Sequence, residues 1–530
     1  MKKVRLFSTV LLVSFSVQAA LAQSPQLTSA LDRIFNKHEF TGGAHLVQGA
    51  RWLHDGAEYT IVEPSMEIKG SQDIVQYDTA SGKRSVLVSA TKLIPSPGAK
   101  PLSIEDHAWS ADNHLLLIFT NTKKVWRLNT RGDYWVLDLA SGKLTKLGGD
   151  APESSLMFAK FSPDSHSVAF VRANNIYVQD LSTYDVRVLT TDGSPTLING
   201  TSDWVNEEEL KIRDGFRWST DSQSIAFWQF DTTGVGEYTL INDTEQEYPV
   251  TTKYLYPQPG TTNSAVRAGV VSAKGGPVTW IKLPGDPCQH YIARLDWVPN
   301  SNDLVLEYLN RLQNTNTVFI ANAQTGDVHQ FFEDTDRAWV DVVESFNWID
   351  HNNSLLWLSE RDGWRHAYVF SHAIGQPKLI TNFAADVISE VAVDEKNGWF
   401  YFIASPDNAT QTYLYRAHLD GSGSPERVTP AEKAGSNVYD ISPDGQWAFH
   451  FHSTFNHPRV VELVHLPDHK VVRVLQGQRG TRAQSQRPRI DADRILQGSG
   501  LRWSYARRIH DPPAGLRSRQ EISSACQCLR

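Results

Sequence analysis

A short motif recurs eight times between residues 52 and 445, and few architectures can accommodate such a repeat. In each copy an aromatic or apolar residue precedes a polar turn, and a short apolar strand follows. The copies begin at Trp52, Trp109, Phe161, Trp218, Trp297, Trp348, Val393 and Ile441. Most begin about 45–57 residues apart, with one wider gap between Trp218 and Trp297.

The turn residues explain why each copy reverses the chain. In Ser442-Pro-Asp-Gly445, proline sets φ, aspartate bonds locally and glycine accepts a positive φ. Blades of four strands repeated in this way are typical of a β-propeller. Eight blades of roughly 50 residues need about 400 residues, and Phe40–Gln476 supplies 437. We therefore predict an all-β fold, an eight-bladed β-propeller over residues 40–476. The alternative, a stack of unrelated β-sandwiches, would show independent linkers in place of one recurring turn.

The amino terminus has the pattern of an export signal. Lys2, Lys3 and Arg5 precede the apolar run Leu6–Val17, and Ala20-Leu21-Ala22 forms an A-x-A cleavage site. The run is too short to span a bilayer, which needs roughly 20 residues. We expect residues 1–22 to be a cleaved signal, residues 23–39 a short helical lead-in, and the mature chain to be periplasmic or secreted without a membrane span.

The charge changes abruptly near residue 477. Gly477–Arg530 holds 11 Arg, no Lys and four acidic residues, so its net charge is +7. Because the whole chain has a net charge of −8, residues 1–476 have a net charge of −15. An acidic body argues against a nucleic-acid partner, which would require a basic surface. We interpret residues 477–530 as a basic tail that is disordered or produced by a shift of reading frame. The alternative is a genuine basic tail that contacts a partner or a membrane surface.

Three consecutive glutamates, Glu207 to Glu209, precede the fourth copy of the repeat. In a strand, adjacent glutamates would point to opposite faces. On a short helix neighbours are about 100° apart, so two carboxylates can bracket one small cation. Asn206 is the expected helix cap. Spacing alone equally fits a solvated acidic helix start that is favourable to the helix dipole.

The segment Asp203-Trp-Val-Asn-Glu-Glu-Glu209 resembles the glutamate motif of the dipeptidyl peptidase IV family of serine peptidases. The resemblance implies that this motif projects into the cavity of an eight-bladed propeller. It also implies that Glu208 and Glu209 bind the free α-ammonium of a peptide. Asn206 departs from the family, which usually has an aromatic residue at that position.

A second segment, Val125-Trp-Arg127, is similar to the Trp-Arg segment of the same family. The similarity implies that Arg127 contacts a carbonyl of the peptide near its amino end. From the sequence alone, a solvated arginine on a blade edge is the alternative. The resemblance covers roughly residues 27–476.

The family's catalytic domain has no counterpart in these 530 residues. Its nucleophile lies in a G-x-S-x-G elbow, and this pattern does not occur in the sequence. The residues on either side of Ser504 resemble those beside the family's nucleophile, but both glycines of the G-x-S-x-G pattern are missing. We therefore predict no catalytic residue. His450 and His452 lack a framework with metal spacing, and we expect neither a metal nor another cofactor.

The sequence thus predicts the substrate-recognising propeller of a dipeptidyl peptidase IV-like serine peptidase. This family releases dipeptides, often X-Pro or X-Ala, from peptide amino termini. The chain as printed should bind peptide amino termini without hydrolysing them. The alternative is a periplasmic propeller that acts as a protein-interaction scaffold. The sequence leaves open whether the chain forms a homodimer.

Overall fold

The computed structural model describes residues 25–37, 47, 49–371, 374–455 and 457–476. The chain divides into residues 43–477 as one unit and the residues on either side as a second, and each is treated by itself. In the second unit the described residues form helix α2 (Pro25–Leu31) and the π-helical turn η1 (Asp32–Asn36). The predicted signal, residues 1–22, and the predicted basic tail with Ser504 lie outside the described residues.

Residues 43–477 are nearly all β, which confirms the predicted class. The first sheet contains β1 (Arg51–Leu53), β2 (Glu58–Pro64), β3 (Gln72–Asp78) and β4 (Arg84–Val88). An eight-stranded sheet follows, formed by β5 (Asp106–Trp109), β6 (Leu115–Val125), β7 (Leu128–Asp138), β8 (Leu144–Lys146), β9 (Leu156–Phe161), β10 (Ser167–Arg172), β11 (Asn175–Asp180) and β12 (Val186–Val188). It consists of two groups of four strands that are joined where β7 pairs with β9.

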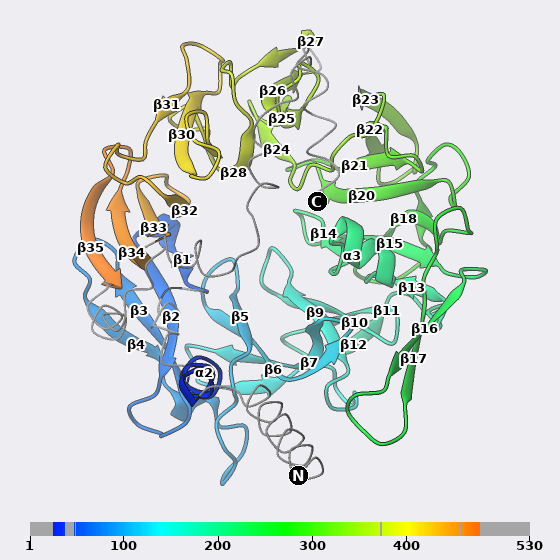
Figure 1. Ribbon diagram of the computed structural model, residues 1–530. Coiled ribbons are helices and arrows are strands. Elements are labelled where there is room, and N and C mark those ends of the chain that lie inside the picture. The colour runs from blue at the N-terminus through cyan, green and yellow to red at the C-terminus, as the bar shows by residue number, and fades with distance from the viewer. Residues whose placement is uncertain (1–24, 38–46, 48, 372–373, 456, 477–530) are drawn as a thin grey trace, which may run out of the picture. The chain divides into compact units, whose positions relative to one another are not determined.

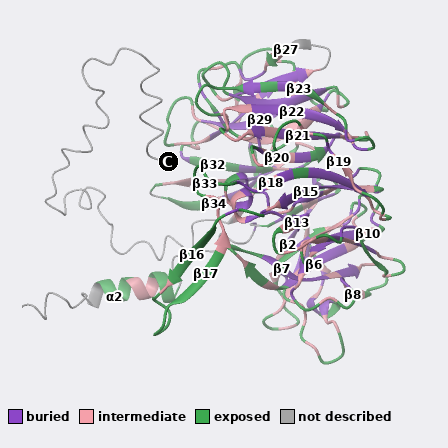
Figure 2. Ribbon diagram, turned by 90° about the vertical axis from the view of Figure 1, so that its right-hand side faces the viewer, coloured by how far each residue is buried: buried purple, intermediate pink, exposed green. Residues whose placement is uncertain are grey.

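The next sheet is interrupted by a helix and a hairpin. It contains β13 (Leu197–Asn199), β14 (Phe216–Trp218), β15 (Ser224–Asp231), β18 (Ala265–Ser272) and β19 (Thr279–Trp280). Helix α3 (Trp204–Leu210) lies between β13 and β14, and the hairpin of β16 (Glu237–Asn242) and β17 (Val250–Leu255) lies between β15 and β18. Figure 2 shows this hairpin as an exposed arm that leaves the body of the sheets. The arm accounts for most of the wider gap in the repeat.

Four four-stranded sheets complete the unit. Their strands are β20 (His290–Trp297), β21 (Asp303–Asn310), β22 (Thr315–Asn322) and β23 (Val328–Thr335); β24 (Asn347–Ile349), β25 (Ser354–Ser359), β26 (His366–Ser371) and β27 (Ile374–Leu379); β28 (Val387–Asp394), β29 (Trp399–Ala404), β30 (Tyr413–His418) and β31 (Glu426–Arg427); β32 (Ser436–Ile441), β33 (Trp447–Thr454), β34 (His457–His465) and β35 (Lys470–Gln476). Consecutive strands pair antiparallel. Short 3-10 turns, η2 (His54–Gly56) and η3 (Ala90–Leu93), lie near the first sheet.

All eight copies of the sequence motif connect the first strand of a group to the second. In the last copy the Ser442 hydroxyl donates to Asp444 Oδ1 at 2.6 Å, and the Gln446 N–H donates to the same oxygen at 3.0 Å. Gly445 follows with φ of +71°, a conformation that glycine adopts without steric cost. Matching Ser–Asp bonds occur in three other copies, at Ser110, Ser162 and Ser219. The predicted turn chemistry is therefore confirmed.

The sheets follow one another around a centre in chain order (Figure 1). Apolar clusters fill the spaces between neighbouring sheets, and each contains side chains from adjacent groups. Tryptophans of the repeat add hydrogen bonds between groups. The indole N–H of Trp109 donates to Thr60 Oγ1 at 3.3 Å, and that of Trp297 donates to the Arg217 carbonyl at 3.1 Å. Trp109 thereby ties its strand to the second strand of the preceding group, and Trp297 ties its strand to β14.

Trp52 joins the first sheet to the last. Its ring stacks on Phe449 with centroids 4.4 Å apart, and its indole N–H donates to Asp440 Oδ1 at 2.9 Å. The Asp444 N–H also donates to the Asp55 carbonyl at 3.1 Å. Among the described residues, no strand of either sheet comes from the other end of the chain. Side chains and one turn therefore hold these two sheets together.

We expect Trp52→Ala to destabilise the fold by about 2–3 kcal/mol, because a half-buried indole is lost together with its hydrogen bond to Asp440. Trp52→Phe should cost less, since it keeps an aromatic ring against Phe449. Trp364→Ala is the matched control, because Trp364 is 40% exposed. Chemical denaturation measures the differences. Equal losses at positions 52 and 364 would contradict the role given to Trp52.

Glu307 is a buried carboxyl on β21. Its Oε1 accepts from Asn316 Nδ2 at 2.7 Å and from the Val343 N–H at 2.9 Å. Its Oε2 has no hydrogen-bond partner among the described residues. Burial raises the pKa of Glu307 to about 7, and the charge of Arg294 opposes that rise only in part. The folded protein therefore keeps this proton at pH values where the unfolded chain releases it.

Since the folded pKa is above the unfolded value near 4.5, the contribution of Glu307 to stability is present below pH 4.5 and is lost as the pH rises through 7. Glu307→Gln retains an oxygen for both donors but does not titrate. The stability of the variant relative to the native chain should rise by about 3 kcal/mol between pH 4.5 and 8. Denaturation across this range tests it, and parallel pH profiles would disprove the assignment.

Candidate functional site

Helix α3 interrupts the innermost strand of its sheet. Both β13 and β14 pair with β15, one with its end and the other with its beginning. The chain between them forms α3, which lies on the inner side of the ring of sheets in Figure 1. The ends of this excursion meet where the Gly215 N–H donates to the Gly200 carbonyl at 3.0 Å. A Cβ at Gly215 would lie 2.7 Å from the Gly200 backbone, so glycine is required for this approach.

Asp203 begins the helix. Its Oδ1 accepts from the Asn206 N–H at 2.9 Å and from Asn206 Nδ2 at 2.8 Å, while its Oδ2 accepts from the Ser264 hydroxyl. The prediction that Asn206 caps the helix is therefore wrong. Asn206 is buried in the first turn and donates to the true cap. The prediction assumed that the helix begins three residues before Glu209. The helix begins earlier, because the extended backbone that a cap residue requires occurs at Asp203.

Trp204 fastens α3 to the base of the β16–β17 arm. Its ring stacks on Tyr254 with centroids 5.5 Å apart and meets Tyr256 edge-on at 5.0 Å. Tyr238 packs against the same two tyrosines from the other strand of the arm. Sequence analysis missed this support. The wider gap in the repeat was the available signal, because an insertion at that point had to lie next to the glutamates.

The three glutamates have three different environments. Glu207 is 7% exposed and lies 3.5 Å from Arg213 Nε, and burial raises its pKa, although the charge of Arg213 opposes this rise. Glu208 Oε1 forms an ion pair with Arg127 Nη2 at 2.9 Å. Glu209 is exposed, and no described cation lies within ion-pair distance of it. Only Glu208 and Glu209 are thus open to an external cation.

Arg127 reaches Glu208 from the turn between β6 and β7. Trp126 holds this turn with φ of +51°, so the arginine that follows leaves the edge of the second group of strands. The side chain of Arg127 is 71% exposed and that of Glu208 is 29% exposed. The structure therefore brings together two of the three predicted site residues, which are 81 positions apart, with Glu209 on the same helical turn. Ion pairs this exposed contribute little energy and can be exchanged for others.

This arrangement suits a small cation that also carries a hydrogen-bond acceptor. Two adjacent carboxylates attract a positive charge, and an arginine beside them can donate to an oxygen of the same ligand. Among the residues that the structure describes, no cluster of His, Cys, Asp and Glu could hold a metal ion. His450 lies in a buried network with Glu462 and Asn437 instead. None of the described helices is long and apolar enough to cross a bilayer.

Comparison with known proteins gives a consistent result. Residues 110–459 match the family described as the dipeptidyl peptidase IV (DPP IV) N-terminal region. Dipeptidyl aminopeptidase B of Saccharomyces cerevisiae is 30% identical over 359 residues, which are 64% of this chain and 43% of that protein. A probable dipeptidyl-aminopeptidase B of Talaromyces stipitatus is 28% identical over 361 residues, or 63% of this chain and 40% of the relative.

A solved structure extends the comparison to the fold. The crystal structure of Porphyromonas gingivalis dipeptidyl peptidase 4 superposes with a TM-score of 0.75 and 26% identity, over 84% of this chain and 62% of that one. The chain spans less than half the length of the curated relatives named above. The family match covers well over half of the chain and includes both Arg127 and the glutamate helix. This chain therefore belongs to the family of the dipeptidyl peptidase IV N-terminal region.

Proposed function

We propose that residues 40–476 form an eight-bladed β-propeller that binds the free amino terminus of a peptide through Glu208 and Glu209. Eight groups of strands, each begun by one copy of the repeat, support the blade count. The observation that carries the function is the convergence of Arg127 and Glu208, from different groups of strands, beside the unpaired Glu209. The relatives carry peptidase names, which favours this function over an interaction scaffold.

The proposed binding reaction exchanges one ion pair for another. In the free protein Arg127 neutralises Glu208. An arriving ammonium would pair with both glutamates and release the guanidinium, which then donates to a carbonyl oxygen of the peptide. One charge pair near 4 Å is worth about 4 kcal/mol before desolvation at an effective dielectric of 20. A peptide without the terminal charge would gain none of this and would leave Glu208 paired only with Arg127.

Binding without hydrolysis is the second part of the proposal. The 530 residues contain no G-x-S-x-G elbow, the pattern that positions a serine nucleophile in α/β-hydrolases. The relatives' names describe peptidases, and this chain matches only part of their length. We infer that it supplies selection of the amino terminus. The basic and apolar start of the sequence supports export to the periplasm or the outside of the cell.

Calorimetry with Ala-Pro-Ala and its N-acetylated form tests the binding. The free-amine peptide should bind at least tenfold more tightly, since a charge-assisted contact is worth about 1.5–3 kcal/mol. The double variant Glu208→Gln, Glu209→Gln should remove this preference. Glu237→Gln is the matched control, because Glu237 is an exposed glutamate on the arm paired with Lys253. Equal affinity for the two peptides would refute the proposal and favour the scaffold function.

A chromogenic X-Pro substrate tests the second part. The purified 530-residue chain should give no turnover above the buffer rate, although the substrate should compete with Ala-Pro-Ala for binding. Ser504→Ala should change neither result. Turnover that survives Ser504→Ala but is lost in Glu208→Ala would show that another nucleophile operates, and the inference of binding alone would be wrong.

A further inference from the structure

A pocket of about 390 Å³ opens beside the residues that follow α3. Four cationic side chains and two carboxylates line it: Lys211, Arg213, Arg217, Arg294, Asp214 and Glu344. This volume is within the range of small-ligand sites. The part of this wall from Lys211 to Arg217 follows the acidic helix α3 directly in the chain.

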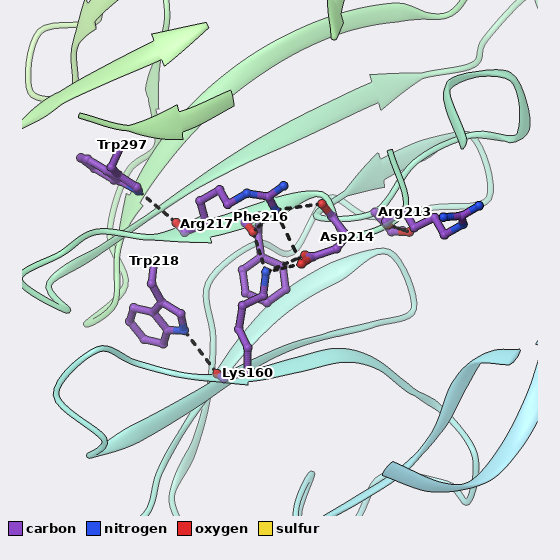
Figure 3. A network of polar contacts seen from close by, with 8 residues as sticks. Lys160, Arg213, Asp214, Phe216, Arg217, Trp218 and Trp297 are labelled. Atoms are coloured by element: carbon purple, nitrogen blue, oxygen red, sulfur yellow. Dashed lines mark hydrogen bonds and ion pairs between the residues drawn. The ribbon is translucent and has the colours of Figure 1, made fainter. Parts of the chain in front are cut away.

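The two carboxylates of the pocket already have cationic partners. Lys160 Nζ lies 2.5 Å from Asp214 Oδ2 and 2.7 Å from Asp214 Oδ1, as Figure 3 shows. Lys211 Nζ lies 3.3 Å from Glu344 Oε1. Asp214 is shared between Lys160 and Arg217, and Glu344 is paired with Lys211, so neither carboxylate is left without a cation.

Two of these arginines donate mainly to neutral oxygens. Arg294 Nη1 donates to the carbonyls of Leu210 and Ala293 at 2.8 and 2.6 Å. Arg217 Nη1 donates to the Phe216 carbonyl at 2.8 Å and lies 3.6 Å from Asp214 Oδ2. Burial lowers the pKa of Arg294, and the charges of Glu307 and Glu344 oppose this change. An anion in the pocket would further stabilise this buried guanidinium.

Arg213 is the cation most available to a ligand. Its Nε lies 3.5 Å from Glu207 Oε1, which is too far for a normal hydrogen bond. Figure 3 shows its guanidinium turned away from the network of Lys160, Asp214 and Arg217. Its side chain is 41% exposed. A planar guanidinium in this position can take a carboxylate with two parallel hydrogen bonds.

Three further acids lie close to these cations: Glu207 near Arg213, Asp296 near Arg217, and Glu307 opposite Arg294 in the β20–β21 register. Burial raises the pKa of each one. The ionised form of each acid is thus less favoured than in water. Among the residues that line the pocket, the four cations outnumber the two carboxylates.

We propose that this pocket binds the side-chain carboxylate of an acidic first residue, Asp or Glu, in the peptide whose ammonium pairs with Glu208 and Glu209. This inference rests on the proposed function. An amino-terminal Asp or Glu carries an ammonium and a carboxylate on one residue. The chain offers the complementary pattern, because Lys211 and Arg213 follow Glu209 by two and four positions. The pocket would therefore select the first residue of the peptide by charge.

The test compares three free-amine peptides by calorimetry with the full chain: Glu-Pro-Ala, Gln-Pro-Ala and Lys-Pro-Ala. Glu-Pro-Ala should bind about tenfold or more tightly than Gln-Pro-Ala, since the carboxylate gains charge-assisted hydrogen bonds. Lys-Pro-Ala should bind most weakly of the three. The advantage of Glu-Pro-Ala should shrink as salt is added, because part of the pocket is exposed.

Variants of the pocket locate the effect. The double variant Lys211→Gln, Arg213→Gln should bring the Glu/Gln affinity ratio close to one. Arg213→Lys keeps the charge and should keep most of the ratio. Lys282→Gln is the matched control, since Lys282 is an exposed lysine paired with Asp327 on another part of the chain.

The possible results separate the two proposals. Equal binding of Glu-Pro-Ala and Gln-Pro-Ala by the native chain, with acetylation still abolishing both, would overturn the pocket and leave the amino-terminus site intact. Equal binding of free and acetylated peptides would overturn both proposals. A ratio that persists in a folded double variant would place the carboxylate elsewhere and would refute the assignment. The native ratio decides the matter even if the double variant fails to fold.

Discussion

The contact between the first and last sheets is the constraint on which the site depends. Arg127 belongs to the second group of strands and α3 to the fourth, so they meet only while the sheets keep their order around the centre. That order is closed by Trp52 on Phe449 and Asp440, by a backbone hydrogen bond between two turns, and by apolar packing. Within the part of the chain that the structure describes, the first and last sheets exchange no strand. Packing far from the glutamates therefore sets the distance between the two halves of the site.

Placing a helix inside a sheet creates a backbone problem that the sequence solves locally. An innermost strand that stops midway must satisfy its hydrogen bonds again where it resumes. Gly200 and Gly215 meet through their backbones, and β15 continues to pair on both sides of the break. Asp203 satisfies the first turn of α3, and Arg294 satisfies the Leu210 carbonyl at its end. The helix is thus held at both ends by side chains from the surrounding sheet.

Local chemistry decided which parts of this structure were predictable. The Ser-Asp turns depend on residues within five positions of one another, and so the motif predicted all eight connections. Glu208, Glu209 and Arg127 came from resemblance to a family, and the structure places Arg127 against Glu208. Contacts between distant residues were not predicted from the sequence. Examples are the stacking of Trp204 on Tyr254 and the bond from Ser264 to Asp203.

The electrostatics of the site follow from the direction in which each charged side chain leaves the backbone. Along α3 the rotation per residue sends Glu207 into the protein, Glu208 towards Arg127, and Glu209 into the open. The left-handed residue Lys211 then ends the helix, with φ of +58°, and turns the following chain towards β14. The acidic side chains thus lie on α3, and the basic side chains that follow it, Lys211 and Arg213, line the neighbouring pocket. A ligand with one charge of each sign is the kind of molecule that such a pair of surfaces can distinguish from its neutral analogues.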